Sequence, residues 1–200
     1  MKIKKRIAAA AAFILVITIL TGAFTGCSKQ EEGAPDGYKS ASNDRVDYSL
    51  YVPADWVVDT APESQLTAAR VSEYDSSNIS MTAYVDEDGD YKSVDEYWET
   101  YKETLSGVFD KKANEQGDRV STFTVVKPSE NAESDGENCL LGGAGAVKYV
   151  YTATMGGIEL KYMQVIALKN STFYIFTYTA SADKYSEDTV SGILENFKFK

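Results

Sequence analysis

Histidine is absent from the 200-residue sequence. Its absence excludes the Ser-His and Cys-His pairs of many hydrolases, and it removes the commonest protein ligand of transition metals. Enzymatic chemistry would have to use paired carboxylates or a serine-lysine dyad. Because the chain has 30 acidic residues, some carboxylates are neighbours by chance, and proximity in the sequence does not identify a catalytic pair. We therefore predict a protein that is not an enzyme, with no catalytic residue, no metal ligand set and no cofactor.

Cysteine is scarce, with Cys27 and Cys139 as the two examples. If Cys27 is modified, as argued below, Cys139 is left alone and no disulfide can form within the chain. The fold must then be stabilised by packing. Cys139 precedes Leu140 and Leu141 at what the pattern indicates is the entrance to a strand. We interpret it as a small core or boundary residue, and the alternative is a reactive thiol.

Positive charge is also scarce, with 20 basic residues against 30 acidic ones and a formal net charge of -10. Such a surface repels phosphate backbones, so we expect no nucleic-acid partner, and broad adhesion to anionic lipid is equally disfavoured. The acidity serves solubility in the simplest interpretation. The alternative is an acidic surface that docks a partner.

The amino terminus differs from the rest of the chain. Four basic residues lie among the first six, and residues 7–20 are apolar except for Thr18, which matches the charged and hydrophobic regions of an export signal. This apolar run is short for a membrane span, since a helix needs about 20 apolar residues to cross the hydrocarbon. A permanent anchor would have to continue to Phe24, and this is the alternative.

The tetrapeptide Phe24-Thr25-Gly26-Cys27 follows the apolar run and resembles the lipobox of a bacterial lipoprotein signal. Thr25 and Gly26 are small, as the pattern requires, whereas Phe24 replaces the usual leucine. The resemblance implies cleavage before Cys27 and attachment of diacylglyceryl, with palmitate-type acyl chains, to the Cys27 thiol. It places the protein at the cell membrane, lipid-anchored on the extracytoplasmic face, in a bacterial cell.

This interpretation divides the chain into three segments. Residues 1–26 form the signal peptide, and residues 27–44, which contain glycine, proline and several serines, form a flexible tether. Residues 45–200 form one folded domain. Within it, short strands are expected at residues 48–52, 56–58, 66–74, 79–85 and 121–126, and residues 129–138 are expected to form an exposed acidic loop.

A helix is predicted from Ser93 onward. Ser93 and Glu96 form a capping box, in which the serine oxygen and the glutamate carboxylate satisfy backbone donors at the helix start. The apolar residues that follow share one stripe, and the charged ones lie opposite. The predicted stripe is Val94, Tyr97, Trp98, Tyr101, Leu105 and Val108. A closing helix is expected from near Ser186, with Val190, Ile193, Leu194 and Phe197 buried.

Residues 146–155 and 158–169 flank Gly156-Gly157, which predicts a hairpin with a two-residue turn. A third strand is expected at residues 173–180, after Asn170-Ser171. These three strands should form a meander at the centre of the sheet. Both faces of the last strand are largely apolar, which predicts that it is covered on both sides.

The order of these elements resembles the PsbP-like domains, the fold of a photosystem extrinsic protein and of a Ran-binding nuclear import factor. The resemblance is carried by residues 51–56 (Tyr-Val-Pro-Ala-Asp-Trp), the helix at 93–105, the hairpin around Gly156-Gly157, and the ending from 174–178 to 197–199. It implies an α+β fold with a central antiparallel sheet flanked by helices, an α/β/α sandwich. The better-known members of that family are non-enzymatic and dock to larger assemblies, and their histidine metal sites cannot be carried over to this chain.

Residues 86–90 (Asp-Glu-Asp-Gly-Asp) have a composition that favours a hard cation, since oxygen ligands around a glycine turn suit calcium. With Gly89 at the sixth position, Tyr84 falls at the first, where a carboxylate is required. We therefore predict a solvated connection between a strand and a helix, and calcium binding is the alternative.

The 14 tyrosines could form a platform for a sugar or a peptide, because each ring has an apolar face and a polar tip. Most lie at regular strand or helix spacing, so we expect them to pack in the core and on the sheet. From loop position alone, we predict a binding surface around Trp56, Tyr84, Asp88 and Tyr91.

The predicted protein is thus a monomer that is held at a membrane by Cys27 and serves an envelope protein as a non-enzymatic binding or assembly module. The alternative is a receptor lipoprotein that binds a solute or cation and works with a transporter, and a carboxylate hydrolase is a third possibility. A deep apolar pocket would favour the receptor. A flat surface with a patch would favour docking.

Overall fold

The computed structural model describes residues 33–109, 122–155 and 157–200. The predicted signal peptide, the Cys27 anchor, the first part of the tether and Gly156 lie outside the described residues. The described strands are β1 (Tyr38–Ser40), β2 (Tyr48–Ser49), β3 (Tyr51–Pro53), β4 (Val57–Val58), β5 (Thr67–Arg70), β6 (Asn78–Val85), β7 (Thr124–Val126), β8 (Gly136–Leu141), β9 (Ala144–Met155), β10 (Ile158–Lys169), β11 (Thr172–Ser181) and β12 (Lys198–Phe199). The helices are α2 (Val94–Val108) and α3 (Asp188–Glu195).

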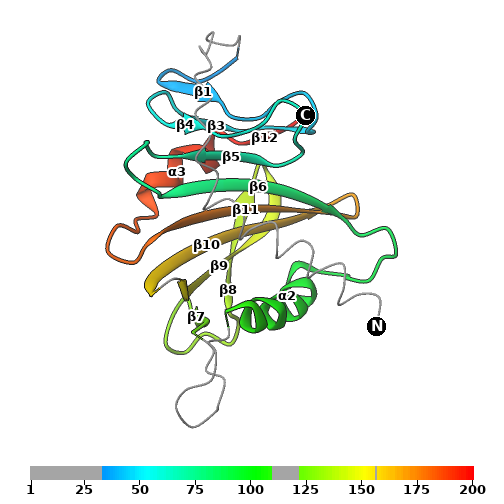
Figure 1. The fold of residues 1–200 in the computed structure, drawn as a ribbon. Coiled ribbons are helices and arrows are strands. Elements are labelled where there is room, and N and C mark those ends of the chain that lie inside the picture. The colour runs from blue at the N-terminus through cyan, green and yellow to red at the C-terminus, as the bar shows by residue number, and fades with distance from the viewer. Residues whose placement is uncertain (1–32, 110–121, 156) are drawn as a thin grey trace.

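One antiparallel sheet of eight strands dominates the molecule (Figure 1). Its order is β4-β5-β6-β11-β10-β9-β7, and β8 also pairs with β9. The predicted meander is confirmed, because β9, β10 and β11 are consecutive neighbours and β11 lies between β10 and β6. The turn between β10 and β11 uses Asn170 and Ser171, both with positive φ (50° and 57°). Two small pairs, β1 with β3 and β2 with β12, complete the described strands.

Successive side chains of β11 point to opposite faces of the sheet, and each face has its own hydrophobic core. Phe173 and Ile175 pack with residues of α2, and we call this set the α2 cluster. Tyr174 and Phe176 pack with residues of α3, and we call this set the α3 cluster. The strand is buried from Phe173 to Ala180, as a central strand covered on both sides requires.

Helix α2 begins as its sequence predicts. The Ser93 side-chain oxygen accepts the Glu96 backbone N–H at 3.1 Å, and the Glu96 carboxylate accepts the Lys92 N–H at 2.7 Å. The first contact satisfies a donor that the first helical turn leaves unpaired. The second binds the residue before the cap, whereas the predicted capping box would use the N–H of Ser93 itself. The predicted stripe is buried as far as Leu105. Val108 is wrong as a core residue, because it lies at the last turn and is 40 % exposed.

Helix α3 is shorter than expected from its pattern, but Val190, Ile193 and Phe197 are buried in the α3 cluster as predicted. Leu194, which the pattern predicts to be buried with them, is only partly buried against this cluster. Cys139 is half-buried and packs against the same cluster, which confirms its interpretation as a boundary residue. Burial raises the pKa of the Cys139 thiol above its ordinary value, and the nearby Lys148 ammonium opposes the shift. In the described part of the chain, no helix is long and apolar enough to cross a membrane.

The predicted tether at residues 27–44 requires a correction. Tyr38–Ser40 form β1, which pairs with β3, and Ala41 is buried in the α3 cluster. The Tyr38 ring also lies against α3, since a Cβ added to Gly192 would meet the Tyr38 hydroxyl at 2.1 Å. The folded domain therefore begins by Tyr38 rather than at residue 45. Composition alone does not identify β1, because most residues around it are polar or small, as in a flexible tether.

The predicted loop at residues 129–138 is also too long, because β8 begins at Gly136. The acidic residues and the glycine of this segment are typical of a loop, but Gly136 lies in a strand, opposite Tyr149. In the same way, the predicted strand at 66–74 is shorter in the structure, as β5 ends at Arg70. The turn after it is fixed by Ser72, whose hydroxyl accepts the backbone N–H of Asp75 at 3.0 Å.

Candidate functional site

The acidic loop at residues 86–90 is folded around Asp86. The two carboxylate oxygens of Asp86, which is buried, accept the backbone N–H groups of Asp90 and Tyr91, each at 3.0 Å. Gly89 has a φ of +65°, which suits a tight turn. Within the described ranges, no group of three or more acidic or cysteine side chains is arranged to hold a metal ion. Asp86 thus stabilises the loop that connects β6 to α2 by accepting two of its backbone N–H groups.

The structure does not bring the four predicted site residues together. Trp56 is 5 % exposed and belongs to the α3 cluster. Tyr91 is 8 % exposed and, with Tyr84, belongs to the α2 cluster on the other face of the sheet. Asp88 is exposed in the acidic loop. A single surface around all four residues is therefore wrong, because the aromatic rings serve two separate cores.

The two tyrosines of this group are packed against other rings. Tyr84 stacks on Tyr97 with ring centroids 6.1 Å apart, and Tyr91 meets Tyr97 edge to face at 5.4 Å. Both rings also contact Phe173 of β11. Such contacts stabilise the junction of α2 and the sheet, and they leave only part of each ring available to a partner.

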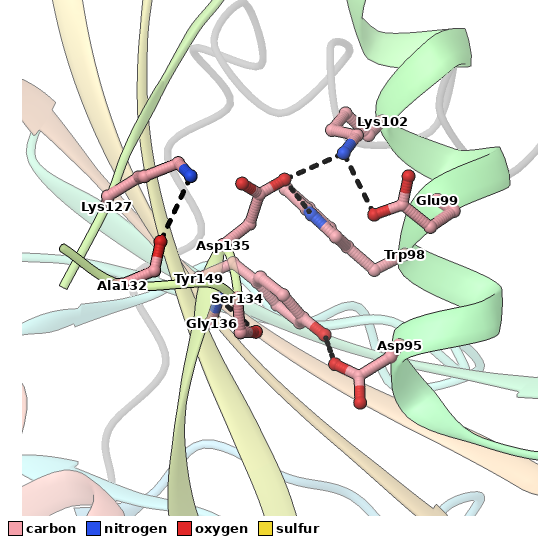
Figure 2. A network of polar contacts seen from close by, with 10 residues as sticks. All are labelled: Asp95, Trp98, Glu99, Lys102, Lys127, Ala132, Ser134, Asp135, Gly136 and Tyr149. Atoms are coloured by element: carbon pink, nitrogen blue, oxygen red, sulfur yellow. Dashed lines mark hydrogen bonds and ion pairs between the residues drawn. The ribbon is translucent and has the colours of Figure 1, made fainter.

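A hollow of about 450 Å³ lies instead between α2, the segment before β8, and β9 (Figure 2). Its walls carry four carboxylates and one ammonium group above an aromatic base. The lining residues are Asp95, Trp98, Glu99, Lys102, Glu133, Ser134, Asp135 and Tyr149. We call this feature the acidic hollow. None of the four predicted site residues lines it.

The base of the acidic hollow is a tightly packed pair of aromatic rings. Trp98 of α2 stacks on Tyr149 of β9 with a centroid distance of 4.1 Å and an interplanar angle of 11°. The Tyr149 hydroxyl donates to Asp95 at 2.8 Å, and the Trp98 indole N–H points to Asp135 at 3.4 Å. Burial, followed by the bond to Asp95, raises the pKa of Tyr149, so this hydroxyl stays protonated. Both rings are almost fully buried.

Lys102 forms ion pairs with two carboxylates above this base. Lys102 Nζ lies 2.7 Å from Asp135 and 2.9 Å from Glu99. Partial burial opposes ionisation of Asp135, but hydrogen bonds from Lys102 and Trp98 outweigh it and lower the pKa of Asp135. Partial burial likewise opposes the charge on Lys102, and its two carboxylate partners outweigh this effect and raise the pKa of Lys102. At neutral pH both groups are fully ionised.

Gly136 allows the loop before β8 to approach this base. A Cβ built on Gly136 would lie 2.3 Å from Val147 Cγ1 and 2.6 Å from Tyr149 Cε1, far inside ordinary contact. The Ser134 hydroxyl accepts the Gly136 N–H at 3.1 Å. Lys127 Nζ donates to the Ala132 carbonyl at 3.1 Å across the same loop (Figure 2). The loop is therefore tied at both ends, and Asp135 is held above Trp98.

The helical pattern predicts Glu99 and Lys102 on the side of α2 opposite its buried stripe, where the structure has them. The predicted acidic loop at residues 129–138 is correct up to Asp135. The sequence does not bring the helix and the loop together. The contacts of Asp135 with Trp98 and Lys102 span 37 and 33 residues, and no local pattern encodes such a pairing. Trp98 was expected only to pack against the sheet, which it does while also forming the base of the hollow.

No family model matches the sequence, and no curated protein matches it. Among solved structures, 23 chains match. One is the solution structure of cyanobacterial PsbP (CyanoP) from Synechocystis sp. PCC 6803, with 14 % identity, 87 % of this chain and 99 % of that chain covered, and a TM-score of 0.52. Another is LpqN of Mycobacterium tuberculosis, described as involved in cell envelope biogenesis, with 16 % identity, 84 % and 87 % coverage, and a TM-score of 0.42. The similarity extends over nearly the whole length of the PsbP structure, and this chain therefore has a PsbP-like α+β fold.

Proposed function

We propose that this protein is a non-enzymatic docking module that binds an envelope protein through the acidic hollow. The observation that carries the proposal is the ion-paired geometry of the hollow, in which Lys102 Nζ lies 2.7 Å from Asp135 and 2.9 Å from Glu99. A general acid or base works best with a pKa near the operating pH. Here the pKa of Asp135 is lowered and that of Lys102 is raised, so both move away from neutrality. Such groups serve recognition by charge rather than proton transfer.

The same arrangement supports a macromolecular partner. The hollow is open at the surface, and its base is a pair of stacked rings that cannot be moved without disturbing both α2 and β9. Glu99 and Glu133 are exposed at its margin, where they meet an approaching cation before it is desolvated. Charged margins of this kind steer association and select partners. A receptor for a small solute would use a more enclosed and more apolar site.

The proposal includes the anchor and the layer arrangement that the sequence predicts. The leader supports cleavage before Cys27 and acylation of its thiol, which would hold the module on the extracytoplasmic face of the cell membrane. The α2 and α3 clusters on opposite faces of β11 support the α/β/α sandwich. In that arrangement the acidic hollow lies on the α2 side of the sheet.

The anchor is tested by mass spectrometry of the native protein purified from membranes. We expect a chain that begins at an acylated Cys27, and a Cys27→Ser variant that is released from the membrane fraction. An intact, unacylated amino terminus would refute the anchor. It would leave the docking site itself to be judged by the next experiment.

The docking site is tested by cross-linking in native membranes, followed by affinity purification. The test variant carries Glu99→Lys and Glu133→Lys at the margin of the hollow. A matched control carries Glu73→Lys and Glu195→Lys, which make the same change in net charge at exposed positions outside the hollow. We expect the test variant to lose a partner that the wild type and the control retain. Identical partners for all three proteins would refute the acidic hollow as the docking site.

A further inference from the structure

β8 is an open edge of the main sheet. It pairs with β9 along Gly136–Leu141, and β7 continues along the same side of β9 through the pair Val126 and Val150. No described strand lies on the outer side of β8. The opposite end of the sheet is β4, which has only two residues. Among the described strands, β8 therefore gives the sheet an edge long enough to pair with another strand.

The turn that joins β8 to β9 determines which backbone groups face outward. Gly142 and Gly143 have φ values of 55° and 81°, as in a two-residue hairpin turn of type I′. In such a hairpin Leu141 and its partner Ala144 form a hydrogen-bonded pair, and bonded and non-bonded pairs then alternate along the strand. Asn138 and Leu140 consequently direct their N–H and C=O groups away from β9. None of the described residues supplies a partner for these groups.

The usual protections of an edge strand are weak on β8. It has six residues and contains no proline or lysine, the residues that most often block strand addition. The charge of Glu137 is engaged by Lys148, at 2.9 Å. Leu140 is 69 % exposed, and its side chain lies beside the open backbone groups. This edge can therefore offer both hydrogen bonds and apolar contact to an extended segment.

The acidic hollow indicates the charge of the occupant. Glu133 and Asp135 directly precede β8, so the hollow lies at the Gly136 end of the open edge. A second copy of this chain is disfavoured at this edge because the two proteins would each carry a formal charge of -10. A segment with lysine or arginine at one end meets these carboxylates favourably.

We infer that a segment of the partner adds to β8 as an antiparallel strand, with an apolar side chain at Leu140 and a basic carboxyl end in the acidic hollow. This inference rests on the proposed docking function and specifies the partner as a basic, strand-forming segment. Main-chain hydrogen bonds supply affinity in this mode of recognition, and side chains supply specificity.

The first test uses a short amidated peptide of alternating threonine and valine that ends in two lysines. Hydrogen exchange measured by NMR should show fast exchange at Asn138 and Leu140 in the free protein and protection when the peptide is added. The Glu137 and Cys139 amides, which bond to β9, should be protected in both states. Protection elsewhere with none at Asn138 and Leu140 would overturn the inference.

The second test changes the peptide and leaves the protein intact. N-methylation at alternate residues of the peptide removes the N–H groups of one edge at a time. We expect methylation of one set to weaken binding at least tenfold and methylation of the other set to have little effect. Equal affinity for both methylated peptides would exclude strand addition.

The third test concerns charge and separates this inference from the proposed function. A peptide that ends in two glutamates should bind at least tenfold more weakly, and Glu133→Lys should weaken the lysine peptide whereas Glu195→Lys on α3 should not. If cross-linking in membranes depends on the hollow but the methylated peptides bind alike, docking stands and strand addition fails. If cross-linking is independent of the hollow and no peptide protects β8, both proposals fail.

Discussion

The close approach of Gly136 to the base of the acidic hollow gives a stability prediction that can be worked from distances. In Gly136→Ala the new Cβ would lie 2.3 Å from Val147 Cγ1 and 2.6 Å from Tyr149 Cε1, whereas ordinary contact begins near 3.4 Å. The β8 backbone or the two side chains must move by about 1 Å. Tyr149 is held by Trp98 and by Asp95, so the displacement disturbs the packing of α2 as well.

Overpacking of this kind costs about 1–3 kcal/mol. With a urea m-value of roughly 2 kcal/mol/M, the midpoint of unfolding should fall by roughly 0.5–1.5 M. Tryptophan fluorescence is a suitable signal because Trp98 lies in the disturbed stack. Urea titration of the wild type and the variant at the same pH gives the free energy of unfolding of each.

Gly145→Ala is the matched control. Gly145 is in β9 of the same hairpin, but a Cβ there meets no atom within 4 Å, and its backbone requires no positive φ. This change should be neutral or should stabilise by about 0.4–1 kcal/mol through the unfolded chain. If Gly136→Ala is as stable as Gly145→Ala, the description of the loop as packed tightly against Tyr149 is refuted.

Three further predictions concern α2 and its contacts. Ser93→Ala should lower the free energy of unfolding by about 1 kcal/mol because the Glu96 N–H loses its acceptor, and Ser93→Asp should restore most of it; thermal denaturation measures both. Trp98→Ala should cost about 3–5 kcal/mol in urea unfolding, with Trp98→Phe much milder, and equal losses would contradict a packing role. The pKa of Asp135 is below its ordinary 3.8 in the folded protein, so its charge stabilises the fold above that pH, and the contribution is lost as pH falls through the lowered pKa. Asp135→Asn should therefore be less stable than the wild type at pH 7 and converge with it in acid, and a constant difference across pH would contradict this.

The elements that could be predicted are those whose signals are local. The start of α2 follows from Ser93 and Glu96, three residues apart, and its buried stripe follows from helical spacing. The β10–β11 turn follows from Asn170-Ser171. The exposed Val108 is the exception, since periodicity does not show where the sheet beneath a helix ends.

The candidate site could not be predicted in the same way. Trp56 and Tyr84 both lie beside turns and appear equivalent in the sequence, but Trp56 packs in the α3 cluster just before β4, whereas Tyr84 of β6 packs against the α2 cluster. Asp135 has the composition of a solvated loop, and only the pairing of Gly136 with Tyr149 brings it over Trp98. Tyr38 lies in a polar stretch, and its packing against Gly192 depends on a helix some 150 residues away.

The order of strands also bears on how the chain folds during its synthesis. β6 pairs with β11, and β2 pairs with β12. The strands in the first half of the sequence therefore cannot complete their pairing until residues 198–199 have left the ribosome. Contacts this distant close large loops and form slowly. A chain built in this way remains open while it is being synthesised, because the strands that close its sheet come late in the sequence.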